Sequence, residues 1–173
     1  MEIKTSIPDF VIREAQEEDV PLILAFIREL AAYEQLANEV VTSEEVLRDS
    51  LFGDRMVAEV LLGYFQGEAV SFALFFHNFS TFLGQPGIYL EDLYVKPHMR
   101  GKGLGRSMLA YLAHLARERN CGRFEWWVLD WNKSALKFYR SLGAVPMDEW
   151  TVQRLEGDTL NNLANEFVRG DKL

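Results

Sequence analysis

The chain has 173 residues, enough for a domain with a sizeable core, and its 49% hydrophobic and 25% charged content is that of an ordinary globular protein. Its longest apolar runs, such as residues 20–27, are too short to cross a bilayer, and residues 1–10 lack an apolar signal core, so we expect neither membrane insertion nor export. A formal net charge of −8 argues against general nucleic-acid binding, and a single cysteine, Cys121, excludes an internal disulfide and favours a reducing, cytoplasmic compartment.

The N-terminal part predicts a strand followed by two helices. We expect residues 1–9 to form a loose lead-in and residues 10–173 to form one mixed α/β domain, with a first strand at residues 10–15. Asp19 is placed to cap a helix whose apolar residues recur every three or four positions. Ser43 opens a second helix with two glutamates in its first turn.

The middle and C-terminal parts alternate between strand and helix patterns. Runs rich in β-branched and aromatic residues, separated by glycine turns, predict three consecutive antiparallel strands at residues 56–65, 68–79 and 87–95. The expected elements that follow are a helix at residues 104–119, a strand at 123–131, a helix capped by Asn132 and closed by Gly143, a strand at 144–155 and a helix at 158–167.

The segment RGKGLGRSM, residues 100–108, joins an expected strand to an expected helix and combines cations with closely spaced glycines. The first amides of a helix are unpaired and carry the positive end of its dipole, and glycines let the backbone approach a phosphate. A Walker loop would need Gly-Lys-Ser/Thr, and a dinucleotide fingerprint would need a small residue where Met108 stands. An anion site remains, and so does a plain tight turn with exposed basic residues.

The pattern R-x-x-G-x-G in this segment, together with the stretches YLEDLYVKPHMRGKGLG, VLDWNKSALKFYRSLGA and RELAAYE, resembles the GNAT-type N-acetyltransferases, which use acetyl-CoA. Within that family the stretches are most similar to the diamine acetyltransferase branch, which includes spermidine/spermine and thialysine acetyltransferases. The resemblance covers nearly the whole chain from Phe10. It implies the GNAT fold, with a central, mostly antiparallel sheet flanked by helices, and a homodimer.

The resemblance also implies where acetyl-CoA binds. The pyrophosphate would lie in the glycine turn, and the pantetheine arm would bond to the backbone of the preceding strand as an added strand does. The implied cofactor-binding residues are Leu93, Tyr94, Val95, Arg100, Gly101, Lys102, Gly103, Leu104, Gly105, Arg106, Asn132, Ala135 and Tyr139. None of the three histidines has the spacing of a metal site, so no metal is expected.

Acetyl transfer to an amine sets an acid–base requirement. An alkyl ammonium has a pKa near ~10.4, so freeing its lone pair at neutral pH costs about 4–5 kcal/mol. By resemblance, Glu91 is the base, acting through water or by orienting the ammonium, and Asp92 supports it. Tyr139 matches the tyrosine of N-x-x-A-x-x-x-Y that protonates the CoA thiolate, and the amide of Leu93 would bond to the carbonyl oxygen. The residue pattern alone allows solvated carboxylates and a core tyrosine instead.

Acidic and aromatic residues are the candidates for the amine end, because both kinds of group attract an ammonium. The candidate substrate-binding residues are Tyr33, Glu34, Glu91, Asp92, Glu125, Trp126, Trp127 and Glu149. A core aromatic and a surface acid are the simpler interpretations of Tyr33 and Glu34. We expect a small amine with a second charged group, either a diamine or polyamine or a lysine-like amino acid such as thialysine. The alternatives are another amine, such as a protein lysine, and a non-catalytic acyl-CoA sensor.

Overall fold

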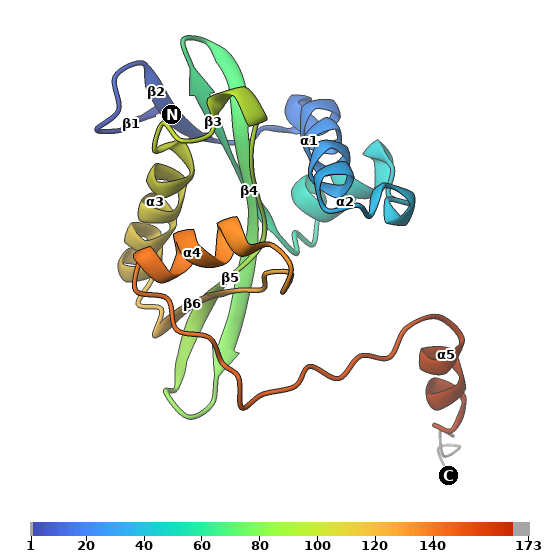
Figure 1. Ribbon diagram of the computed structural model, residues 1–173. Coiled ribbons are helices and arrows are strands. Elements are labelled where there is room, and N and C mark those ends of the chain that lie inside the picture. Colours follow the sequence, from blue (N-terminus) through green and yellow to red (C-terminus); the bar gives the residue numbers. More distant parts are fainter. Residues whose placement is uncertain (1, 168–173) are drawn as a thin grey trace. The chain divides into compact units, whose positions relative to one another are not determined.

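The computed structural model describes residues 2–167 (Figure 1). The contacts between its residues divide the chain into two compact units, Met1–Trp127 and Val128–Leu173, and each is described by itself. Residues 168–173, which the predicted domain includes, lie outside the described residues. The mixed α/β class that the sequence predicts is confirmed, since the first unit is a sheet flanked by helices.

The sheet of the first unit has six strands in the order β1-β2-β3-β4-β5-β6. Each neighbouring pair is antiparallel except β5 and β6, which are parallel. The bounds are Glu2–Lys4 for β1, Phe10–Glu14 for β2, Glu59–Phe65 for β3, Glu68–Ser80 for β4, Gln85–Val95 for β5 and Arg123–Trp126 for β6. The three consecutive antiparallel strands predicted from the sequence are therefore confirmed as β3, β4 and β5.

The N-terminal segment corrects an expectation, because part of the predicted lead-in is strand β1. It pairs antiparallel with β2, with Glu2 opposite Arg13 and Lys4 opposite Val11. The sequence EIK has no apolar run to announce a strand. An edge strand of this length owes its conformation to the backbone hydrogen bonds that its neighbour offers, and a local pattern does not record that neighbour.

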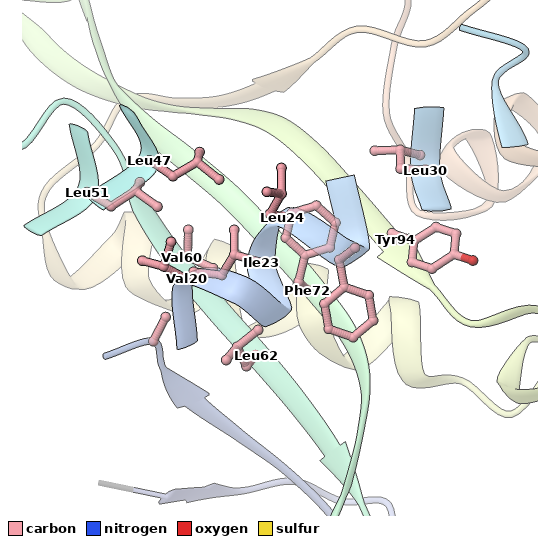
Figure 2. Packing of buried hydrophobic residues seen from close by; sticks show 12 residues of the cluster. Val20, Ile23, Leu24, Leu30, Leu47, Leu51, Val60, Leu62, Phe72 and Tyr94 are labelled. Carbon is pink, nitrogen blue, oxygen red and sulfur yellow. The ribbon is translucent and has the colours of Figure 1, made fainter. Parts of the chain in front are cut away.

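Helices cover both faces of the sheet (Figure 1). On one face lie α1 (Val20–Tyr33) and α2 (Glu44–Phe52), and on the other lies α3 (Leu104–Glu118). Figure 2 shows the core under α1 and α2. Within this core the rings of Phe26 and Phe72 stack with their centroids 5.4 Å apart. The buried residues labelled there are Val20, Ile23, Leu24, Leu30, Leu47, Leu51, Val60, Leu62, Phe72 and Tyr94.

Three-residue 3-10 helices lie at Glu17–Asp19 (η1), Ala37–Glu39 (η2) and Pro97–Met99 (η3).

The helix starts follow the predicted caps with one exception. Ser43 accepts a hydrogen bond from the amide of Val46 at 3.3 Å, as expected for the cap of α2. Asp19 precedes α1, but its carboxylate accepts two hydrogen bonds from Arg13, at 2.7 and 2.8 Å, and a third from the amide of Gln16 at 2.7 Å. A bidentate guanidinium is a stronger partner than a neutral amide, so Asp19 ties β2 to the start of the helix instead of capping it.

The central strands β4 and β5 do not pair evenly, and this irregularity shapes the candidate site. Leu74 pairs with Asp92, whereas the next residue, Phe75, pairs with Leu90. Glu91 is therefore an extra residue on β5 and forms a β-bulge. A bulge interrupts the alternation of side chains, so adjacent carboxylates at this point need not lie on opposite faces.

The second unit contains α4 (Lys133–Ser141) and α5 (Gly157–Asn165), both as predicted. Asn132 caps α4 by accepting from the amide of Ala135 at 3.1 Å, and Gly143, with φ of +89°, follows its end. The strand predicted at residues 144–155 is wrong, since this segment has no regular structure, and the strand predicted at 123–131 ends at Trp126. A strand requires a paired neighbour, which alternating side chains alone do not supply. Within residues 2–167, no helix is long and apolar enough to cross a membrane.

Candidate active site

The glycine turn has the backbone geometry of an anion site. Gly101 and Gly103 have φ angles of +77° and +85°, in the left-handed region that residues with a side chain rarely adopt. Gly103 is the residue before α3 and has no side chain to cap the helix. The amides of Leu104, Gly105 and Arg106 begin the helix and have no partner within it, so they form a donor cluster at the positive end of the dipole.

Three cationic residues belong to the glycine turn and the first turn of α3, and two of them contact aromatic rings. Arg100 lies with its guanidinium carbon 4.3 Å from the ring centroid of Tyr33, and Lys102 lies with Nζ 5.6 Å from that of Phe65. Arg100, Lys102 and Arg106 are all exposed. The side chain of Leu104 is buried in the core, so this predicted cofactor residue can offer a ligand only its backbone. A turn with open amides and exposed cations fits a pyrophosphate.

The strand before the turn has an open edge. Among the described residues, β6 pairs with β5 from Gly87 to Leu90, and from the bulge onward β5 has no strand on that side. The amide of Lys96 donates to Val70 on the β4 side at 2.9 Å. Because successive backbone groups of a strand point to opposite edges, those of Val95 and Leu93 face the open edge, and those of Tyr94 face β4.

This alternation refines the predicted cofactor contacts. Leu93 presents its backbone amide and carbonyl to the open edge, and Val95 presents its amide there, because the Val95 carbonyl already accepts a hydrogen bond from Nε of Arg100. The backbone of Tyr94 pairs with Phe72 instead, and its side chain is buried with Phe26, at a centroid distance of 6.1 Å. We therefore omit Tyr94 from the residues that would bond to the pantetheine arm.

Two other carboxylates act on Asp92 near the bulge. Burial first, and then the negative charges of Glu91 and Glu34, together raise the pKa of Asp92 from 3.8 to about 7. Burial also raises the pKa of Glu34, the residue that follows α1. Glu91 is exposed at the bulge, whereas Asp92 is partly buried. The structure therefore separates the two adjacent carboxylates: Asp92 is poised to exchange a proton near neutral pH, and Glu91 faces solvent.

The carboxylate of Glu125 has other partners. Its Oε2 atom forms an ion pair with Nε of Arg123 at 2.8 Å and accepts a hydrogen bond from Asn78 at 2.9 Å. This carboxylate is already neutralised, so it is a poor candidate to receive a substrate ammonium. We accordingly give it a structural role on the sheet.

The remaining predicted residues are aromatic or belong to the second unit. The ring of Trp126 lies 4.9 Å from that of Phe124, and the ring of Trp127 lies 5.9 Å from that of Tyr89. Asn132, Ala135 and Tyr139 lie on or beside α4, and Glu149 lies in the irregular segment after it. Their roles stay predictions. Across residues 2–167 no group of three or more metal-ligating side chains is placed to hold an ion.

Sequence reasoning missed two features of the site. It ranked Asp92 below Glu91, because the bulge that distinguishes them has no signature in the letters LEDL. It also gave no sign that Tyr33 and Arg100, 67 positions apart, are in contact. The sequence signals available were the apolar face of α1, which includes Tyr33, and the short connection from β5 to Arg100. Neither signal indicates that these two residues are in contact.

Comparison with known proteins shows which family this chain resembles. Residues 24–144 match the Acetyltransferase (GNAT) family. The chain is 42% identical over 167 residues to thialysine N-epsilon-acetyltransferase of Sus scrofa, covering 90% of this chain and 98% of the relative. It is 29% identical to L-ornithine N5-acetyltransferase of Arabidopsis thaliana, covering 86% and 85%.

A solved structure agrees with the fold. An integron cassette protein from V. cholerae superposes with a TM-score of 0.77 at 28% identity, covering 90% of this chain and 98% of that one. The family match spans the site described above. It includes the glycine turn at the start of α3, the bulge in β5 and the open edge of β5. The chain belongs to the GNAT family of acetyltransferases.

Proposed function

We propose that this protein transfers the acetyl group of acetyl-CoA to the terminal amine of a lysine-like amino acid such as thialysine, with diamines and polyamines as the second substrate class. One observation carries the proposal. Glu91 and Asp92 lie on β5, the strand that leads into the glycine turn, and Glu34, at the end of α1, is close enough to act electrostatically on Asp92. A cationic amine and an anionic acyl donor thus each have a matching partner within one unit of the fold.

Acetyl-CoA fits the first part of this site. Its pyrophosphate would be held by the amides of residues 104–106 and by the side chains of Arg100 and Lys102. Its pantetheine arm would bond to the backbone of Leu93 and to the amide of Val95. When bound, acetyl-CoA supplies a thioester that an amine can attack. We propose that the amide of Leu93 donates to the thioester oxygen, where negative charge develops.

The carboxylate pair at the bulge suits the removal of a proton from the substrate. An ordinary aspartate near pKa 4 is a poor acceptor for a proton from an ammonium near ~10.4, with a mismatch of about 6 units or 9 kcal/mol. At a pKa of about 7, the mismatch of Asp92 falls to about 3 units, or roughly 5 kcal/mol. We propose that Glu91 binds and orients the substrate ammonium, and that the proton passes to the carboxylate pair and resides on Asp92.

Acetyl transfer then requires a proton at sulfur. The new C–N bond forms as the C–S bond breaks, and the electron pair of that bond leaves on the thiolate. We propose that the hydroxyl of Tyr139 on α4 supplies the proton, and that Asn132 and Ala135 contact the cofactor, as the motif N-x-x-A-x-x-x-Y implies. The cap of α4 by Asn132 supports the helical setting that the motif needs.

The choice of a lysine-like substrate rests on the relatives and on charge. The 42% identity to a thialysine acetyltransferase extends over nearly the whole chain. Glu34 follows α1 and Glu91 lies on β5, so Glu34 can bind the second cationic group while Glu91 orients the amine that reacts. Tyr33, Trp126 and Trp127 are further candidates for contact with the alkyl stem, and Glu149 for contact with a charged end.

A panel of amines tests the substrate. We would measure release of CoA thiol with thialysine, lysine, ornithine, putrescine, spermidine and the uncharged-chain amine butylamine. We expect kcat/KM to be highest for thialysine, and at least tenfold lower for butylamine because it lacks a second charged group. Glu34→Gln should raise KM for thialysine, whereas Glu45→Gln, on the exposed start of α2, is the matched control. Equal rates with butylamine would refute the acidic site, and no turnover with any amine would favour a sensor.

We also propose that the two units act as one cytoplasmic GNAT domain and that the protein is a homodimer. The family match runs from residue 24 to 144 and so spans both units. The irregular segment exposes apolar side chains that a partner would cover, namely Val145, Met147, Trp150, Val152 and Leu155. Among the described residues, β6 is the last strand of the sheet order, so its outer edge has no strand paired with it. Light scattering should return about twice the chain mass of 19.9 kDa, and a monomer at micromolar concentration would refute the dimer.

A further inference from the structure

The guanidinium of Arg100, the first residue of the glycine turn, is held by three residues from two elements of the first unit, α1 and β5. Its carbon lies 4.3 Å from the ring centroid of Tyr33, the last residue of α1, and 5.6 Å from that of Tyr94 on β5. Its Nε atom donates to the carbonyl of Val95 at 2.9 Å. Arg100 itself is exposed to solvent, so these contacts, and not burial, determine where its charge lies.

The orientation that these contacts impose suits an anion. The hydrogen bond to Val95 uses Nε, and the other four N–H groups belong to the paired nitrogens that fit a phosphate. A ring lying against the flat face of a guanidinium leaves the edge, where the N–H groups are, accessible. A free arginine side chain would lose its rotamer entropy when it binds a ligand, and one already held loses less.

We propose that Tyr33 is a positioning residue for acetyl-CoA: it holds the guanidinium of Arg100 in the orientation that binds the pyrophosphate. This inference rests on the proposed function, since it takes acetyl-CoA as the ligand of the turn. Tyr33 has 38% of its surface exposed and therefore contributes little to the core, which argues against a merely structural tyrosine. The sequence had placed Tyr33 only at the amine end.

A double-mutant cycle tests the coupling. We would measure binding of CoA by calorimetry to wild type, Tyr33→Leu, Arg100→Gln and the double variant. Tyr33→Leu removes the ring face and should weaken CoA binding about 3–10-fold, the range of a partly exposed cation–π contact. In the Arg100→Gln background the same change should cost less than about twofold, because the group that Tyr33 positions is gone. Tyr33→Phe keeps the ring and should stay within about twofold of wild type.

The controls separate positioning from general damage. Tyr111→Leu removes a partly buried tyrosine from α3 and should leave CoA affinity unchanged. If Tyr33→Leu does not fold, as judged from its thermal midpoint, Tyr33→Gln replaces it in the cycle. A wild-type affinity in the folded Tyr33 variant, or an equal loss in both backgrounds, would overturn the inference while leaving acetyl-CoA binding intact. Failure of wild type to bind CoA would overturn the cofactor proposal and this inference together.

Discussion

Replacing Asp92 with asparagine should make the protein more stable and less active, and the stability gain should depend on pH. The folded-state pKa of Asp92 is about 7, against 3.8 for the ordinary carboxyl. A raised pKa means that the folded protein holds the proton more tightly than the unfolded chain, so stability is lost as pH rises from about 4 towards 7. Above pH 7, ionisation of Asp92 lowers the unfolding free energy by the full pKa shift of about 3 units, or roughly 4 kcal/mol.

The magnitude can be followed across pH. At pH 5 the unfolded carboxyl is mostly ionised and the folded one is protonated, so about 1–2 kcal/mol is already lost; at pH 8 the loss approaches 4 kcal/mol. Asparagine keeps the shape of the side chain and cannot ionise. Asp92→Asn should therefore exceed wild type in unfolding free energy by about 2–3 kcal/mol more at pH 8 than at pH 5.

Urea denaturation of both proteins at the two pH values measures this difference. Asp158→Asn, an exposed aspartate in the first turn of α5, is the control and should show no change in the gap between pH 5 and pH 8. The same Asp92→Asn protein should lose activity about 10²–10⁴-fold at pH 8, the usual weight of a proton acceptor. A stability gap that is equal at both pH values would refute the raised pKa, and full activity would refute its role.

The other predictions concern the cofactor, the acid and the sheet. Gly103→Asp, at a φ of +85°, should place strain and a negative charge at the phosphate site, and calorimetry should show at least a tenfold loss of CoA affinity. Tyr139→Phe should lower kcat roughly 10²–10⁴-fold with a far smaller change in CoA affinity, and steady-state kinetics that matched wild type would contradict its role as the acid. Asp19→Asn should destabilise the fold by about 1–3 kcal/mol at pH 7, because the partly buried guanidinium of Arg13 loses its charged partner. The pKa of Asp19 is lowered mainly by its hydrogen bond with Arg13, so the difference in unfolding free energy between wild type and Asp19→Asn should shrink as pH falls below about 4. Urea denaturation at several pH values measures this difference.

Local chemistry explains where the sequence predictions succeed. Ser43 and Asn132 cap α2 and α4 as predicted, because a capping side chain needs only the backbone amide of a residue two or three positions further along the chain. The glycines at 101 and 103 take the left-handed conformation that their spacing before a helix suggests. Where a partner outside the helix or strand itself decides, the predictions fail. The carboxylate of Asp19 binds Arg13 and the amide of Gln16 instead of an amide of α1, and the alternating residues 144–155 form no strand.

The sequence by itself determined the family, the helices, the three central strands and the glycine turn, because each depends on residues close together in the chain. Only the tertiary structure decided which carboxylate has its pKa raised and which aromatic ring holds Arg100. Desolvation, Coulomb interaction and ring stacking act through space, across distances set by how α1 packs on the sheet and by one extra residue at Glu91. A single inserted residue in a strand changes which side chains share a face, and no local pattern of residue types records that choice.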